Sequence, residues 1–139
     1  MCGDAMTTVL FACVHNAGRS QMAAAWFTAL ADPSKARAIS AGTDPRPRVH
    51  PEVVAAMTEV GFDLSGAPTT KLTSELAARA SMLITMGCGD QCPVVPGLTR
   101  DDWPVEDPKG KPVETVRAIR DEIRRRVQAL LEKKGWAIR

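Results

Sequence analysis

The stretch Cys13-Val14-His15-Asn16-Ala17-Gly18-Arg19-Ser20 decides how this chain can be organised. An apolar run, Val9-Leu10-Phe11-Ala12, precedes it, and a helix-prone segment begins at Arg19. A strand, a short loop and a helix N-terminus in this order form an anion cradle, because the loop N–H groups and the helix dipole direct positive charge at one point. We therefore expect these residues to bind an oxyanion: Val14, His15, Asn16, Ala17, Gly18 and Arg19.

The spacing between Cys13 and Arg19 predicts a nucleophile beside the bound anion. Five intervening residues let the chain curl so that the Cys13 sulfur and the Arg19 guanidinium face the same bound anion. The field that holds an anion also stabilises the thiolate form of Cys13, which is the reactive nucleophile. The alternative is a buried structural cysteine with a surface arginine, since Cys-x5-Arg alone is a weak motif. The flanking strand and helix favour the nucleophile.

Length and composition favour one compact domain. The chain has 139 residues, of which 45% are hydrophobic and 24% charged, so it can bury a proper core. With 18 basic and 16 acidic residues the net charge is +2, and no overall field indicates nucleic acid or a membrane surface as a partner. No apolar run approaches the roughly 20 residues of a membrane span, and the N-terminus lacks a secretory signal. We expect a cytoplasmic monomer.

Hydrophobic periodicity predicts strands alternating with helices. The expected strands are 8–12, 36–41, 81–86 and 101–105. The expected helices are 19–30, 52–60 with Pro51 at its start, a short one capped by Thr73 or Ser74, and 113–131. This alternation predicts an α/β three-layer sandwich, whose parallel sheet binds ligands beyond the carboxyl ends of its strands. Residues 1–6 are expected to form a flexible lead and residues 7–139 the single domain.

Two further cysteines, Cys88 and Cys92, lie in a glycine- and proline-containing loop after the third expected strand. In a cytosolic chain such cysteines are more often reactive or metal-binding than structural disulfides. A zinc site would need two more ligands, and Cys2, His15 and His50 do not have zinc-finger spacing. We therefore expect no metal.

Asp107 has two interpretations. Asp-Pro-x-Gly is a common turn sequence, so Asp107 alone indicates only a turn. However, the loops that follow parallel strands meet at one edge of a sheet. Four side chains with useful chemistry are therefore expected to converge there: Cys13, Cys88, Cys92 and Asp107.

Taken together, the motifs resemble the arsenate reductases built on the low-molecular-weight protein tyrosine phosphatase fold. The likeness runs from about Thr8 to Leu131, and the matching stretches are Cys13 to Met22, Ser40-Ala41-Gly42, Thr85 to Pro93 and Trp103 to Pro108. The resemblance implies a four-stranded parallel sheet flanked by helices, and no cofactor. It implies arsenate as substrate, with phosphate or sulfate as competing oxyanions. It also implies electrons from thioredoxin, or from a low-molecular-weight thiol with a glutaredoxin-like protein.

The resemblance also implies roles for single residues. It implies that Cys13 is the nucleophile and that Arg19 clamps the oxyanion. It implies that the Ser20 hydroxyl supports the thiolate and that the Asn16 amide shapes the loop. Asp107 would be the proton donor. Cys88 and Cys92 correspond to a pair of redox cysteines that pass a disulfide outward, although their Cys-x3-Cys spacing is short for thioredoxin-linked members.

Three departures from the family pattern bear on these roles. His15 stands where the phosphatases usually have glycine, and Gly18 where a second loop cysteine is common. Ala24 replaces the acidic residue that binds potassium in some relatives, so no potassium site is expected. Two alternatives stay open: a reductase that uses only Cys13 with a small thiol, and a phosphatase that needs no second cysteine.

Overall fold

The computed structural model describes residues 7–86 and 98–138. Four strands form one parallel sheet in the order β2-β1-β3-β4: β1 (Thr7–Cys13), β2 (Ala36–Gly42), β3 (Met82–Thr85) and β4 (Thr99–Asp102). Cys13 pairs with Gly42 at one end of this sheet, and Thr85 pairs with Asp102 at the same end. The predicted four-stranded α/β fold is confirmed, and the carboxyl ends of all four strands lie along one edge.

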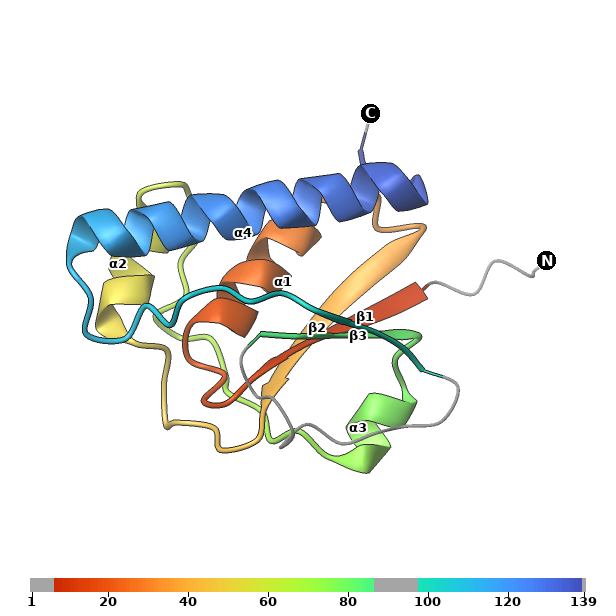
Figure 1. Ribbon diagram of the computed structural model, residues 1–139, viewed down its shortest axis with the longest axis horizontal. Coiled ribbons are helices and arrows are strands. Elements are labelled where there is room, and N and C mark those ends of the chain that lie inside the picture. Colours follow the sequence, from red (N-terminus) through yellow and green to blue (C-terminus); the bar gives the residue numbers. More distant parts are fainter. Residues whose placement is uncertain (1–6, 87–97, 139) are drawn as a thin grey trace.

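Helices cover both faces of the sheet. One face carries α1 (Arg19–Leu30), α2 (Pro51–Thr58) and α4 (Val113–Lys134), and the other carries the short α3 (Ser74–Ala78) (Figure 1). Within the described residues no helix is long and apolar enough to cross a membrane.

The central strand β1 is apolar on both faces because both faces are covered. Val9 and Phe11 pack into the larger core with α1, α2 and α4, whereas Leu10 and Ala12 pack into a smaller core with α3. Alternate side chains of a strand point to opposite faces, so one uniformly apolar run serves two cores. This burial anchors Cys13 at the end of the strand.

The fourth strand is the element that the sequence misplaced most. It was expected at 101–105 but spans Thr99–Asp102, four exposed polar residues at the edge of the sheet that carry no apolar alternation. Trp103 and Val105, which lie in the expected range, are buried in the larger core beyond the end of the strand. Pro104 between them lacks the N–H group that strand pairing needs.

The other boundaries differ by a few residues. Pro51 begins α2 as predicted, but the helix ends at Thr58 rather than at residue 60, and Gly61 turns the chain with a φ of 96°. The Thr73 side chain caps α3 by accepting a hydrogen bond of 3.0 Å from Leu76 N–H. At the other end of the chain, α4 continues to Lys134.

Candidate active site

The loop of residues 14–18 joins the end of β1 to the start of α1 (Figure 1). Three of its carbonyl groups, those of Val14, His15 and Ala17, accept hydrogen bonds from N–H groups in the segment 43–50, as does the carbonyl of Cys13 just before the loop, all at 2.7–3.2 Å. Within the described residues, the N–H groups of residues 14–18 have no protein acceptor. The loop therefore turns its acceptors outward and leaves its donors free, an arrangement that suits an anion.

Gly42, the last residue of β2, gives this loop its room. A Cβ atom at this position would lie 2.6 Å from Val14 O and 2.7 Å from Asn16 N. Only glycine allows the strand and the loop to approach so closely. Sequence reasoning quoted Ser40-Ala41-Gly42 as a motif but gave Gly42 no role.

Three buried side chains line up behind the loop. Asn16 Nδ2 donates a hydrogen bond of 2.8 Å to Ser20 Oγ, and Ser20 Oγ lies 2.9 Å from Cys13 Sγ. Because the Asn16 amide already donates to the hydroxyl oxygen, the hydroxyl hydrogen of Ser20 is available for the sulfur. Such a donor stabilises negative charge on Cys13, which is 2% exposed.

The Arg19 side chain is positioned by the segment that follows β4. Its Nη1 donates a hydrogen bond of 3.1 Å to Val105 O, and its Nη2 lies 3.8 Å from Asp107 Oδ2. Asp107 Oδ1 also accepts a hydrogen bond of 3.0 Å from Lys109 N–H, which closes a turn. Asp107 therefore forms the turn and also lies beside Arg19, while its role as proton donor stays a prediction.

The same segment packs over the loop. A Cβ atom on Gly18 would lie 3.1 Å from Pro108 Cγ and 3.7 Å from His50 Cδ2. Gly110 N–H donates a hydrogen bond of 2.7 Å to Glu52 Oε2, a bond that lowers the pKa of the Glu52 carboxyl and ties the segment to α2. A glycine at position 18 leaves space for Pro108, which carries Asp107 close to the loop.

His15 holds a second arginine at the rim of the loop. Arg46 Nη2 lies 3.0 Å from His15 Nε2, and because a guanidinium can only donate, Nε2 is the acceptor and carries no proton. Partial burial and the charges of Arg46 and Lys109 lower the pKa of His15. The imidazole is therefore neutral at neutral pH, and its lone pair keeps Arg46 in place.

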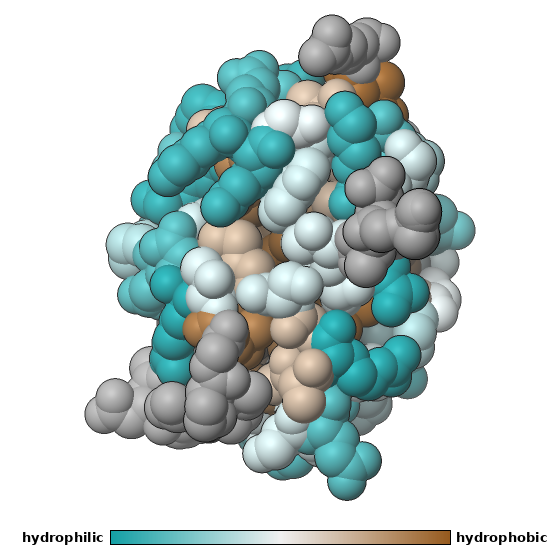
Figure 2. All heavy atoms as spheres, turned by 90° about the vertical axis from the view of Figure 1, so that its right-hand side faces the viewer, coloured by the Kyte–Doolittle hydropathy of each residue, from teal (hydrophilic) through white to brown (hydrophobic). Residues whose placement is uncertain are grey.

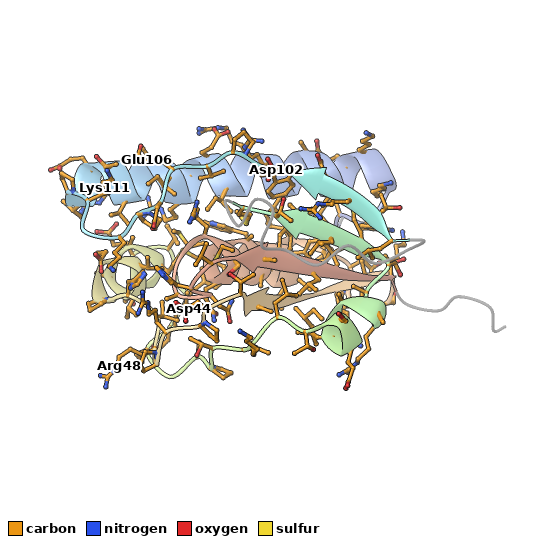
Figure 3. The ribbon with its side chains drawn as sticks, turned by 60° about the horizontal axis from the view of Figure 1, so that its bottom comes forward. Asp44, Arg48, Asp102, Glu106 and Lys111 are labelled. Carbon is orange, nitrogen blue, oxygen red and sulfur yellow. The ribbon has the colours of Figure 1, made fainter. Side chains whose placement is uncertain are left out.

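A basic groove borders this rim at the start of α2. It encloses about 340 Å³ and is lined by Arg46, Pro47, Arg48, Val49, His50, Pro51 and Lys109. Arg48 extends outward at this corner of the molecule (Figure 3). Sequence reasoning missed the basic groove, because Arg46 and Arg48 lie in a turn-rich segment with no motif.

A second cavity, of about 410 Å³, lies at the opposite edge of the sheet. It is lined by side chains of β3, β4 and the C-terminal half of α4, including Met82, Thr99, Arg126 and Lys133. Figure 2 looks onto this end, where hydrophilic side chains surround a small apolar hollow. This cavity lies at the amino ends of the strands, whereas the cradle lies at their carboxyl ends.

Comparison with known proteins agrees with this geometry. The family model described as low molecular weight phosphotyrosine protein phosphatase matches residues 8–135. The chain belongs to this family. The matched range contains every residue from Cys13 to Arg19.

Relatives in this phosphatase family have arsenate reductase in their names. A putative arsenate reductase of Halobacterium salinarum is 36% identical over 141 residues, covering 96% of this chain and 96% of its own. The glutaredoxin arsenate reductase of Synechocystis sp. is 35% identical, covering 92% and 98%. The solved thioredoxin-dependent arsenate reductase of Corynebacterium glutamicum matches with a TM-score of 0.79 and 37% identity, over 94% of this chain and 63% of that one. This chain thus spans less than two thirds of the corynebacterial chain.

The predicted site residues of this phosphatase-family chain divide into two groups. Cys13, Ser20, Arg19 and Asp107 come together around the loop, with the contacts given above. Cys88 and Cys92 lie outside the described residues, so their predicted convergence with Cys13 and Asp107 stays a prediction. Within the described part of the chain, no three His, Cys, Asp or Glu side chains form a group that could hold a metal ion.

Proposed function

We propose that this protein reduces arsenate to arsenite with Cys13 as the nucleophile. The observation that carries the proposal is the contact of the Cys13 sulfur with the Ser20 hydroxyl, at 2.9 Å, beside a loop of free N–H groups and the Arg19 guanidinium. An anion cradle with a thiolate at its start suits attack on the central atom of a tetrahedral oxyanion. Relatives named arsenate reductase, which match almost the full chain, support arsenate as that oxyanion.

In the first step the Cys13 thiolate attacks the arsenic of bound arsenate. A sulfur–arsenic bond forms and an arsenic–oxygen bond breaks, and the departing hydroxide takes a proton from Asp107 and leaves as water. Arg19 and the N–H groups of residues 14–18 stabilise the remaining oxygens. Arsenic stays in the As(V) state during this step.

In the second step Cys88 attacks the Cys13 sulfur. A Cys13–Cys88 disulfide forms and the sulfur–arsenic bond breaks. The electron pair of that bond stays on arsenic, the proton of the Cys88 thiol passes to an arsenic-bound oxygen, and arsenic leaves as arsenite, As(III). Cys92 then attacks Cys88, which frees Cys13 and leaves a Cys88–Cys92 disulfide for thioredoxin to reduce. Support for this relay comes from the family resemblance and from the thioredoxin-dependent relative.

A second route has its own support. The Synechocystis relative is named a glutaredoxin arsenate reductase, which favours a small thiol as the attacking group. That thiol would form a mixed disulfide with Cys13 and release arsenite, and a glutaredoxin-like protein would then reduce the mixed disulfide. A phosphatase activity on phosphoesters is the third candidate, since the matching family model is that of a phosphatase.

Single-turnover arsenite release from fully reduced protein, without external reductant, tests the relay. We expect nearly one arsenite per chain and, by mass mapping, a Cys88–Cys92 disulfide in the wild type. Cys92→Ser should stop at the Cys13–Cys88 disulfide, and Cys88→Ser should release no arsenite. If arsenite appears only after a small thiol is added, the relay is wrong and the second route holds. Turnover of phosphoesters without any arsenite would refute the reductase itself.

We also propose where this protein acts, in which oligomeric state and with which partners. The protein is expected to act as a cytoplasmic monomer without cofactor or metal, and nucleic acid and membranes are not expected as partners. Phosphate and sulfate are tetrahedral oxyanions like arsenate, so they should compete for the cradle. The small net charge of +2 supports a small anion rather than a polyanion as the ligand.

A further inference from the structure

We infer that Gln21, to which the sequence analysis gave no role, is a positioning residue for the nucleophile. Gln21 is the third residue of α1, and it is 6% exposed. Side chains in a helix lean toward its N-terminus, so the first turn of α1 carries the Gln21 amide back to the loop of residues 14–18. The inference rests on the proposed function, because Gln21 acts through Cys13.

The amide nitrogen of Gln21 faces three oxygen atoms. It lies 2.9 Å from Pro68 O, 3.1 Å from Asn16 O and 3.4 Å from Asn16 Oδ1. A backbone carbonyl can only accept a hydrogen bond, so the nitrogen of the amide and not its oxygen must point at this cluster. The two N–H groups of Gln21 therefore join the catalytic loop to residue 68.

These bonds hold Asn16 in an unfavourable conformation. Asn16 has a φ of 50°, the only positive φ of a non-glycine residue within the described parts of the chain. Its side-chain oxygen accepts a hydrogen bond of 2.8 Å from Thr70 N–H, and its backbone oxygen accepts from Gln21. A residue keeps such a conformation only where surrounding contacts stabilise it, and here hydrogen bonds from Gln21 and Thr70 stabilise it.

The conformation of Asn16 decides where its side-chain nitrogen points. That nitrogen donates to Ser20 Oγ, which lies next to the Cys13 sulfur. Three hydrogen bonds thus link Gln21 to the sulfur, from Gln21 to Asn16, from Asn16 to Ser20 and from Ser20 to Cys13. Loss of the Gln21 donors would free Asn16 to relax and would weaken the donor that stabilises the thiolate.

Two substitutions at position 21 remove the donors in different ways. Gln21→Glu keeps the shape of the side chain but turns a carboxylate oxygen toward the three oxygens, which repel it. Gln21→Met keeps the length and removes the hydrogen bonds without adding charge. Gln128→Glu is the matched control, because Gln128 is a half-buried glutamine on α4 that bonds only Glu132 within the described residues. Ile123→Val controls for lost stability, because Ile123 is a fully buried residue of α4.

The readout is the rate of iodoacetamide alkylation of Cys13 in the reduced, full-length protein, followed on the Cys13 peptide by mass spectrometry from pH 5 to 10. At pH 7 we expect alkylation to fall about threefold in Gln21→Met, the scale of one lost hydrogen bond between neutral groups, and about tenfold in Gln21→Glu, where repulsion adds to that loss. The midpoint of the alkylation rate plotted against pH should rise in both variants. Neither control should move the midpoint.

An unchanged midpoint in both Gln21 variants would overturn the inference. An equal shift in Ile123→Val would also overturn it, because general loosening of the fold would then explain the effect. Alkylation requires no arsenate, so the result stands even if arsenate turnover fails. Failure of this inference is thereby distinguished from failure of the proposed function.

Discussion

The two carboxylate oxygens of Asp107 make different contacts at the edge of this site. Its Oδ1 closes a turn with Lys109 N–H, and its Oδ2 lies 3.8 Å from Arg19 Nη2. The turn sets the side chain's position, and Oδ2 is the oxygen that the proposed mechanism uses for proton transfer.

Asp107→Asn separates these two roles. An asparagine oxygen can still accept from Lys109 N–H, but the amide cannot give a proton to a leaving oxygen. We expect kcat for arsenate reduction to fall by about a hundredfold, the scale of a lost general acid, while Cys13 alkylation is unchanged. Asp63→Asn is the control, because Asp63 closes a similar turn with Ser65 on the surface. An unchanged kcat would show that Asp107 is only a turn residue.

Gly42 is the second single residue on which the site depends. In Gly42→Ala the new methyl group would overlap Val14 O and the nitrogen of Asn16, so the loop must shift. We expect a loss of about 1–3 kcal/mol in the free energy of unfolding, as for other overpacked sites, together with at least tenfold slower Cys13 alkylation. Urea unfolding and alkylation measure the two effects. Gly66→Ala is the control, since no atom lies within 4 Å of its new Cβ, and equal effects in both variants would contradict the argument.

At the scale of elements, an ionic clamp joins α2 to α4. Arg120 of α4 donates hydrogen bonds of 2.9 Å to Ala56 O of α2 and to Glu59 Oε1, and Arg117 donates one of 2.6 Å to Glu59 Oε2. The start of α2 carries Glu52, which holds the segment of Asp107. The clamp thus contributes to the site from a distance, by placing the helix.

Glu59 gives this clamp a dependence on pH. Hydrogen bonds from Arg117 and Arg120 lower the pKa of Glu59 from 4.5 to about 2. A depressed carboxyl pKa adds stability above pH 4.5, and this stability is lost as the pH falls from 4.5 toward 2. We therefore expect Glu59→Gln to unfold at lower urea concentration than the wild type at pH 7, and the difference to shrink toward pH 2.

The control for this prediction is Glu132→Gln, which removes an exposed carboxylate bonded only to Gln128 within the described residues. Its unfolding midpoint should stay close to that of the wild type at both pH values. A difference between Glu59→Gln and wild type that persists at pH 2 would show that charge is not its cause.

At the scale of the whole molecule, charge is unevenly placed although the net charge is only +2. Arg46, Arg48 and Lys109 line the groove beside the loop, and among the described residues no acidic side chain lines it. Asp44, which lies 4.0 Å from Arg46, offsets this charge only in part. A cationic rim raises the local concentration of anions at the mouth of the cradle.

Arg48→Gln tests this steering. We expect KM for arsenate to rise about twofold with kcat unchanged, and the effect to fade in high salt, because salt screens exposed charges over about 10 Å at 0.1 M. Arg125→Gln, on the exposed face of α4, should leave KM unchanged. A change in kcat, or an equal change in the control, would refute a steering role.

The sequence predicted the parts of this protein that follow from local chemistry. The apolar β1, the amphipathic α4 and the turn at Gly61 each depend on the order of residues near one another, and all were found where or nearly where expected. The edge strand β4 was misplaced because its residues are polar and exposed, so its position depends on pairing with β3 and not on its own pattern. The basic groove was missed because it joins residues from separate turns.

The sequence by itself determined that Cys13, a five-residue loop and Arg19 lie between the end of a strand and the start of a helix, because these residues are consecutive. Only the tertiary structure decided which distant residues complete the site. Gly42 admits the loop, Val105 orients Arg19, and residues 68 and 70 hold the loop from behind. These contacts span 26 to 86 positions of sequence in this protein. They form because a parallel sheet brings the carboxyl ends of its strands to one edge. No local sequence pattern indicates which distant residues come into contact there.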